Sequence, residues 1–300
     1  MSIATSQQIS KWYELYRAID VTFTKEIMRA TGLEARGVFL KCVGEQWPCV
    51  LYSSSFVGAK IVVSAKAALV DRIKRANNMV SLRLSFRLPD KPDPMAFFIG
   101  AKVVGYAPYS QGGGDFQFAS IQYTQQPPDD YIEIMGRLLE ANINSTRRRE
   151  DRILLTPDAM RRMCLVTKDS MVFVQGVPRR CILRDLSFSG AKAIIVGLAK
   201  FLVGKDCALR IEMDEPREIL EIPGSIVRYE EVEGRKDLTA IAIHFNEQAV
   251  PMSFKMHVND YLGQQRPARN EEPAPSQEPA AAMRRPPSPQ TPPTAPASGA

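Results

Sequence analysis

The segment VSLRLSFRL at residues 80–88 alternates apolar and polar side chains without a break. Successive side chains of a β-strand point to opposite faces of a sheet, so this period of two predicts a strand with one buried and one solvated face. Residues 96–106 and 116–123 also have strand character, and the glycine-rich connection at residues 110–115 is typical of a β-hairpin. Three shorter strands are expected at residues 38–43, 48–52 and 56–63. The first half of the chain is therefore predicted to be a mostly antiparallel β-domain.

Helices are expected to cover this sheet. Apolar residues recur at helical spacing from Ile9 to Ile19, which predicts an amphipathic helix near the start of the chain. Ser64 is expected to cap a second helix. The run Pro127-Pro128-Asp129 stops the last strand and begins a third helix, which is expected to end at an arginine cluster.

The second half of the chain contains many short segments with strand character. They are expected at residues 153–155, 171–174, 181–186, 191–196, 207–213, 218–230 and 240–245. Short strands at close intervals favour a barrel or a sandwich. Phe254, Val258 and Tyr261 then mark a closing helix.

The composition of the 300 residues is that of a globular protein, with 45% hydrophobic and 24% charged side chains. Neither a secretion signal nor an apolar run long enough to span a bilayer is recognisable, so we expect a cytoplasmic location without membrane insertion. The five cysteines are expected to be reduced, buried thiols. Cys42 and Cys49 lack the spacing and the partner histidines of a zinc site, so neither a metal nor a cofactor is expected.

The net charge is +6, and the positive charges are not spread evenly, since Arg147, Arg148, Arg149 and Arg152 fall within one short stretch. Arg148 and Arg152 form an RxxxR motif. About thirty residues later the sequence DLSFSG at residues 185–190 forms a DxSxxG motif. A phosphorylated or polyanionic partner is therefore plausible on charge alone.

The two motifs, in this order and spacing, resemble the signature of the PilZ family. The resemblance implies that the ligand is cyclic di-GMP, that Arg148 and Arg152 lie on the linker entering a β-barrel, and that Asp185, Ser187 and Gly190 lie on the barrel itself. Arg147 and Arg149 either touch ligand or supply local positive potential. In this family the residue before RxxxR influences whether one or two ligand molecules are held, which gives Arg147 particular interest.

Short strings in the first half are similar to the first domain of two-domain PilZ receptors of the PlzA type. They are VTFTK at residues 21–25, VFLKC at 38–42, WPC at 47–49 and YSSS at 52–55. The resemblance implies a mostly β, α+β fold with two small antiparallel β-barrels. The expected parts are an N-terminal PilZ-like domain at residues 1–143, a ligand-binding linker at 144–152 and a C-terminal PilZ barrel with its closing helix at 153–264.

Residues 265–300 hold ten of the 22 prolines of the chain and almost no large apolar side chains. A segment of this composition cannot bury a core and is expected to be disordered.

The chemistry of these residue types fits a cyclic dinucleotide, which offers two phosphates and two guanine edges rich in acceptors. The planar arginine fork donates in parallel pairs to phosphate oxygens or to guanine O6 and N7. Asp185 can accept from guanine N1 and N2, Ser187 can donate to a phosphate, and Gly190 supplies either a positive φ or room for close approach of the ligand.

The leading hypothesis is a receptor in which the ligand bridges linker and barrel and changes the arrangement of the domains. Such a monomer would control an unidentified protein partner in motility or another second-messenger output. The alternative is nucleic-acid binding by the arginine run together with a second set of arginines, Arg83, Arg87, Arg179, Arg180 and Arg184. Catalysis is not expected, because the sequence offers no recognisable nucleophile, metal set or acid–base pair.

Overall fold

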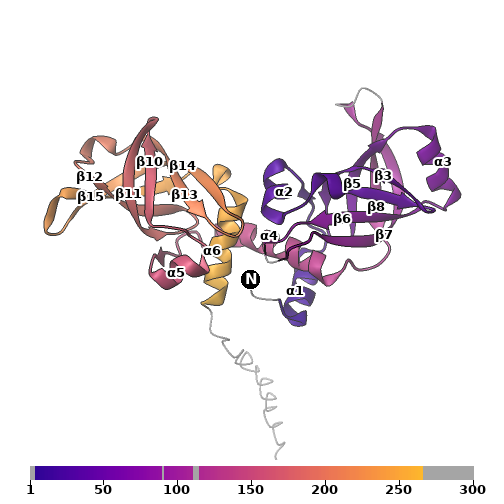
Figure 1. Ribbon diagram of the computed structural model, residues 1–300, viewed down its shortest axis with the longest axis horizontal. Coiled ribbons are helices and arrows are strands. Elements are labelled where there is room, and N and C mark those ends of the chain that lie inside the picture. Colours follow the sequence, from indigo (N-terminus) through magenta and orange to yellow (C-terminus); the bar gives the residue numbers. More distant parts are fainter. Residues whose placement is uncertain (1–3, 90, 111–114, 266–300) are drawn as a thin grey trace, which may run out of the picture. The chain divides into compact units, whose positions relative to one another are not determined.

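The computed structural model describes residues 4–89, 91–110 and 115–265. The segment expected to be disordered lies outside these ranges apart from Gln265, as do residues 111–114 of the expected hairpin connection. The described residues form two antiparallel sheets with helices at their ends (Figure 1). None of the helices in these ranges is both long and apolar enough to cross a bilayer.

The first half contains α1 (Ser6–Tyr16), β1 (Val21–Thr22), α2 (Lys25–Thr31), β2 (Phe39–Cys42), β3 (Glu45–Pro48), β4 (Val50–Ser54), β5 (Gly58–Ser64), α3 (Ala67–Arg75), β6 (Met79–Phe86), β7 (Met95–Pro108), β8 (Phe116–Tyr123) and α4 (Asp129–Arg147). Its eight strands follow the order β1-β4-β5-β8-β7-β6-β2-β3. No pairing among the described residues joins β1 to β3, so this sheet is an open half-barrel. The antiparallel pairing of β7 with β8 confirms the predicted hairpin.

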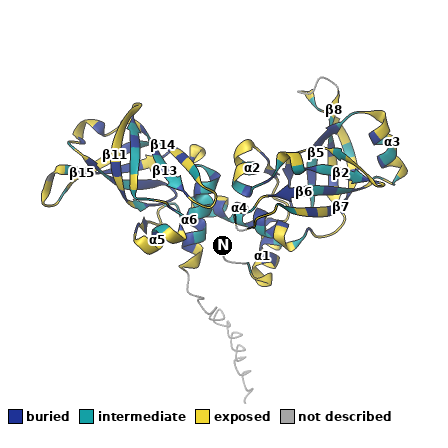
Figure 2. Cartoon of the chain, in the orientation of Figure 1, coloured by how far each residue is buried: buried dark blue, intermediate teal, exposed yellow. Residues whose placement is uncertain are grey.

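The alternation that predicted the strand at residues 80–88 is confirmed in β6. Val80, Leu82, Leu84 and Phe86 are all buried, and they form part of the core of this half. Ser85 on the opposite face is buried as well, and its hydroxyl is satisfied by donating to the carboxylate of Glu34 at 2.9 Å. Figure 2 shows the resulting change from buried to exposed residues along the strands.

Helix α4 covers this sheet with an apolar face and then leads to the second half. Tyr131 is fully buried, with its ring near those of Phe56, Phe86 and Phe97. Its hydroxyl lies 2.7 Å from the Ser54 hydroxyl, so the buried polar atom is satisfied. Asp129 and Asp130 lie in the first turn, where the helix dipole favours negative charge. These contacts fix the direction in which the chain leaves the sheet.

The second half contains β9 (Ile153–Leu154), α5 (Pro157–Arg162), β10 (Asp169–Val174), β11 (Val177–Leu186), β12 (Gly190–Val196), β13 (Asp206–Met213), β14 (Glu218–Val232), β15 (Arg235–Phe245) and α6 (Met252–Gln264). Strands β10-β13-β14-β15-β12-β11 follow one another, and β10 also pairs with β11. The six strands therefore close into the predicted barrel, and β9 adds to it at β11.

The core of the barrel comes from the inward side chains of its strands, among them Leu209, Ile222 and Ile241, which are fully buried. The predicted closing helix is confirmed as α6, whose Phe254 and Val258 are also fully buried in this core. Helix α6 also contacts the last helix of the first half, because the side-chain amide of Asn144 on α4 donates to that of Asn259 on α6 at 2.8 Å.

Three local expectations were wrong or incomplete. Ser64 does not cap α3, because it ends β5 and its hydroxyl accepts from the Lys66 backbone N–H at 3.3 Å. Strand β15 begins at Arg235, five positions before the expected start, since the hairpin with β14 continues to its tip. The short helices α2 and α5 were not expected, although Thr24 and Thr156 cap them with side-chain hydrogen bonds.

All five cysteines are free thiols, and four of them are buried as expected, whereas Cys164 is half-buried. Burial raises the pKa of Cys49 to about 12 and the pKa of Cys181 to about 11. These thiols are therefore uncharged and unreactive at neutral pH.

Candidate functional site

The segment between α4 and the barrel, residues 148–152, contains the RxxxR motif and is called the connector below. Helix α4 ends at Arg147, so residues 144–147 of the expected linker are helical. Arg148 follows as the C-cap, with its N–H donating to the Asn144 carbonyl at 2.8 Å. The Asp151 N–H then donates to the Arg148 carbonyl at 3.0 Å, which makes a hydrogen-bonded turn. Arg148 and Arg152 thus lie in this turn and its exit rather than on one helix face.

Strand β9 places the end of the connector beside the second motif. In its pairing with β11, Leu154 is opposite Asp185 and Ile153 is opposite Leu186. Ile153 is buried in the barrel core, so this short strand is anchored by apolar contact as well as by its ladder. Arg152, immediately before β9, is consequently adjacent to Asp185.

The turn of the DxSxxG motif makes a second attachment to the connector. Its Ser187 N–H donates to the Gly190 carbonyl at 2.8 Å, while Phe188 is buried in the barrel core. Both the N–H and the hydroxyl of Ser189 donate to the Arg149 carbonyl, at 3.3 Å and 2.8 Å. The connector is therefore bonded to the barrel at two points.

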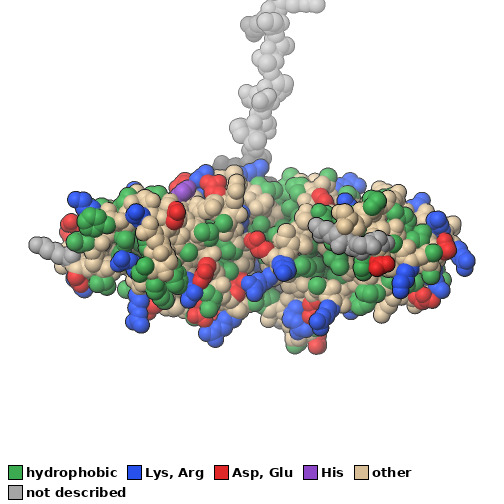
Figure 3. Space-filling model, turned by 90° about the horizontal axis from the view of Figure 1, so that it is seen from above, with side chains coloured by type: hydrophobic (Ala, Val, Ile, Leu, Met, Phe, Trp, Pro, Cys, Tyr) green, Lys and Arg blue, Asp and Glu red, His purple; other side chains and the backbone are tan. Residues whose placement is uncertain are grey.

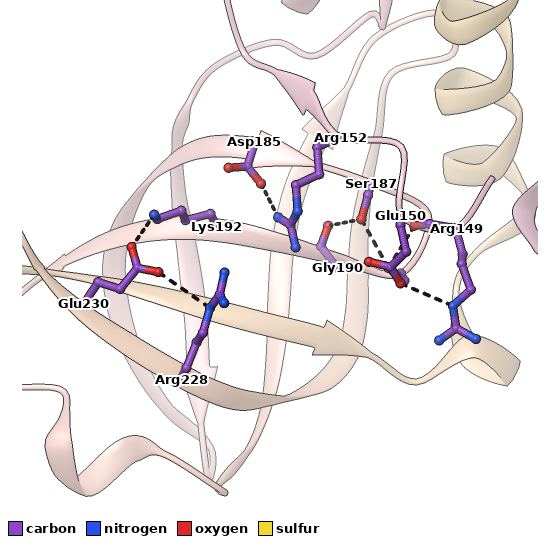
Figure 4. Close-up of polar contacts among 10 residues, drawn as sticks. Arg149, Glu150, Arg152, Asp185, Ser187, Gly190, Lys192, Arg228 and Glu230 are labelled. Carbon is purple, nitrogen blue, oxygen red and sulfur yellow. Dashed lines mark hydrogen bonds and ion pairs between the residues drawn. The ribbon is translucent and has the colours of Figure 1, made fainter.

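The side chains of both RxxxR arginines pair with carboxylates. Arg152 Nη1 lies 2.5 Å from Asp185 Oδ1, as Figure 4 shows. Arg148 Nε lies 2.7 Å from Asp151 Oδ2. These pairs offset the mutual repulsion of the like charges in the arginine cluster.

The flanking arginines differ from each other. Arg149 Nη2 lies 2.5 Å from Glu247 and its Nε lies 3.4 Å from Glu150. Arg147 is exposed in the last turn of α4, where its charge is favourable to the helix dipole.

Ser187 is fully buried in the structure. Its hydroxyl lies 3.3 Å from the Gly190 carbonyl and 3.3 Å from the Ser189 hydroxyl. A contact between this hydroxyl and a phosphate therefore requires the turn to open. In the described conformation, Ser187 stabilises the turn that holds the connector.

The structure requires a glycine at position 190 for a reason that the sequence did not predict. Its φ is outside the left-handed region, and a Cβ at this position would lie 2.3 Å from the Ile243 carbonyl oxygen of β15. The glycine therefore allows β12 and β15 to approach where the turn enters the sheet. Of the two roles considered for this glycine, the positive φ is not found, and the crowding described here comes from the protein backbone.

Sequence reasoning missed three charged residues beside the two motifs, namely Lys192, Arg228 and Glu230. Figure 4 shows them on the same part of the barrel as Arg152 and Asp185. Lys192 could have been found, because it is two positions after Gly190 and a strand returns to the same face every second residue. Arg228 could not, since a bulge between Ile226 and Arg228 changes the register of β14.

The arginines of the nucleic-acid alternative are divided between the two sheets. Arg83 donates to the Gly37 carbonyl at 3.0 Å, and Arg87 pairs with Glu34 at 2.9 Å. Arg179, Arg180 and Arg184 lie on β11. On the face in Figure 3, the coloured Lys and Arg side chains are interspersed with Asp and Glu instead of forming one basic surface.

The two histidines have different environments. His244 is exposed on β15, whereas His257 on α6 lines a hollow of about 640 Å³ together with Trp12 and Arg137. Burial lowers the pKa of His257, so its ring is neutral at pH 7. None of the RxxxR or DxSxxG residues lines this hollow. No group of three or more His, Cys, Asp or Glu side chains among the described residues is arranged to hold a metal ion.

Comparison with known proteins gives the family of the chain. The sequence model of the PilZN3 domain matches residues 7–142, and that of the PilZ domain matches residues 146–264. A Treponema denticola protein named cyclic di-GMP binding protein is 44% identical over 261 residues, covering 87% of this chain and 83% of that protein. The chain belongs to the PilZ family, with a PilZN3 domain followed by a PilZ domain.

Several solved structures are also similar to this chain. Borreliella burgdorferi PlzA in complex with cyclic di-GMP is 20% identical, with a TM-score of 0.39, and the match covers 85% of this chain and 98% of PlzA. Escherichia coli YcgR in complex with cyclic di-GMP is 13% identical, with a TM-score of 0.27, and covers 80% and 86%. The Bacillus subtilis inhibitor of motility MotI is 12% identical, with a TM-score of 0.29, and covers 78% and 98%.

The crowding at Gly190 predicts a loss of stability when this residue is replaced. Gly190→Ala should lower the free energy of unfolding by about 1–3 kcal/mol, because the new methyl group has to displace the β15 backbone. Gly105→Ala is the matched control, since that strand glycine has nothing within 4 Å of an added Cβ. Urea denaturation measures both, and equal stability of the two variants would contradict the packing explanation.

Proposed function

We propose that this chain is a cytoplasmic receptor for cyclic di-GMP that binds the ligand where the connector meets the barrel. The name of the 44% identical Treponema denticola protein supports the identity of the ligand. Free cysteine thiols agree with a reducing compartment. The single observation that carries the proposed site is the pairing of β9 with β11, which brings Arg152 to Asp185.

Binding would proceed by exchange of ion-pair partners. A ligand phosphate or guanine edge replaces Asp185 as the acceptor for the Arg152 guanidinium, and the released carboxylate accepts from guanine N1 and N2. Arg148 exchanges Asp151 for the ligand in the same manner. Ser187 and Gly190 hold the turn, and Ser187 contacts the ligand only if the turn opens.

The exchange is energetically reasonable because the pairs that break are partly exposed. The side chain of Arg152 is 42% exposed, and ion pairs near water are weak compared with hydrogen bonds to a tightly held charged ligand. Hydrogen bonds to charged groups contribute about 1.5–3 kcal/mol each, so several of them support micromolar or tighter affinity after the ordering cost.

The output we propose is regulation of a protein partner rather than catalysis. The connector bears Arg148 and Arg152 and follows α4 directly, while α4 is bonded to α6 through Asn144 and Asn259. A ligand that pulls on the connector can therefore change the contact between α4 and α6. Control of motility or of another second-messenger output is the process we propose.

Removing either motif arginine should weaken binding without unfolding the chain. Arg148→Ala and Arg152→Ala are each expected to raise the Kd for cyclic di-GMP at least about tenfold, because each deletes charge-assisted hydrogen bonds. Isothermal titration measures the Kd, with cyclic di-AMP and GTP as ligands that should bind much more weakly. Arg161→Ala is the matched control, since this exposed arginine pairs with Asp158 on the same domain.

The outcomes of this titration are clear-cut. No heat with the unaltered chain would contradict cyclic di-GMP as the ligand. Heat with the unaltered chain but an unchanged Kd for both Arg148→Ala and Arg152→Ala would place the site elsewhere.

Ligand should also slow amide hydrogen exchange in the connector. Residues 148–152 make few backbone hydrogen bonds, and bonds from their side chains to a ligand should hold them in one conformation. Exchange monitored by mass spectrometry should slow there and change around Asn259, with β6 as an internal control that stays constant. Slower exchange in the connector without any change around Asn259 would contradict a conformational effect of the ligand on α6. The chain would then bind the ligand without this output.

A further inference from the structure

A second pair of cations lies on the outer face of the barrel beyond the two motifs. Lys192 Nζ on β12 donates to the Glu230 carboxylate at 2.5 Å. Arg228 Nε on β14 lies 3.6 Å from the other oxygen of the same carboxylate. Figure 4 shows this group of three beside the Arg152–Asp185 pair.

The strand register places these cations in line with Asp185. Asp185 is opposite Lys192 in the pairing of β11 with β12, and Lys192 is opposite Ala242 in the pairing of β12 with β15. Ala242 is in turn opposite Arg228 in the pairing of β15 with β14. One row therefore crosses four neighbouring strands, over three strand spacings or roughly 14 Å.

This row faces outward. The neighbours of Lys192 along β12, Ala191 and Ala193, are fully buried, so Lys192 points to the opposite, solvated face. Between the two cations the row has only the methyl group of Ala242, which is buried, so longer side chains cover it in the described conformation. The side chains of Lys192 and Arg228 therefore lie along one row with Asp185.

Glu230 acts as the counter-ion of the two cations in the described conformation. The hydrogen bond from Lys192, together with the charges of Lys192 and Arg228, lowers the pKa of Glu230, so the carboxylate is ionised at neutral pH. The side chains of Glu230 and Arg228 are 47% and 63% exposed. Exposed pairs of this kind are weak, so a phosphate can replace the carboxylate at little cost.

We propose that Lys192 and Arg228 form a second subsite of the cyclic dinucleotide site, and that Glu230 is the counter-ion displaced on binding. This inference rests on the proposed function and extends it. Cyclic di-GMP has two phosphates and two guanines, and Arg152 with Asp185 can contact only part of them. Lys192 supplies a point charge for a phosphate, and the Arg228 fork matches a phosphate or the O6 and N7 of guanine.

Isothermal titration of the full chain with cyclic di-GMP tests the subsite. Lys192→Ala and Arg228→Ala are each expected to raise the Kd about tenfold. Glu230→Gln is expected to lower the Kd about threefold, because it removes the competing charge and keeps the shape of the side chain. Arg217→Ala is the control, since this exposed arginine pairs with Glu212 on the same barrel and its loss changes the net charge equally. Thermal melts verify that all variants are folded.

The stoichiometry decides which guanosine phosphate unit occupies the subsite. A weaker Kd at unchanged stoichiometry assigns it to the other half of the same molecule, and a fall from two ligands to one assigns it to a second molecule. Both results support the subsite. An unchanged Kd and stoichiometry in Lys192→Ala and Arg228→Ala, with binding by the unaltered chain, would overturn the subsite but not the proposed function. Absence of binding by the unaltered chain would overturn the proposed function as well.

Discussion

The pairing of β9 with β11 is the constraint on which the candidate site depends. Two residue pairs between β9 and β11, together with the burial of Ile153, hold the end of the connector against the barrel. The hydrogen bonds from Ser189 to the Arg149 carbonyl fix the same connector from the other side. Two motifs separated by about thirty residues in sequence thereby become one charged surface, and α4 links that surface to the first half of the chain.

The ion pairs of this surface explain how such a cluster of arginines is stable without a ligand. Each of Arg148, Arg149 and Arg152 has a carboxylate partner, and Glu230 serves Lys192 and Arg228 in the same way. These partners are partly exposed, so water and incoming anions compete with them. The surface is thus neutralised but exchangeable, which suits a receptor that has to bind and release a small anionic ligand.

The sequence predicted the parts of the molecule that depend on local pattern. Period-two alternation identified β6, and the residue types and spacing of the two motifs identified the candidate ligand-binding residues. It failed where long-range register decides. The crowding at Gly190 comes from Ile243, more than fifty residues away. Arg228 lies in the same row as Lys192 because of a bulge that the residue pattern of β14 does not predict. Carboxylate partners such as Glu247 are likewise contributed by distant elements.

The central claim is that the two motifs act on one ligand through an exchange between Arg152 and Asp185. A double-mutant cycle on the Kd for cyclic di-GMP tests it most directly, using the conservative variants Arg152→Lys and Asp185→Asn and their combination. Residues that share one ligand and pair with each other should give a coupling energy of at least about 1 kcal/mol, whereas independent sites add within about 0.5 kcal/mol. Coupling of this size is the predicted result, and strict additivity of the two substitutions would contradict the account.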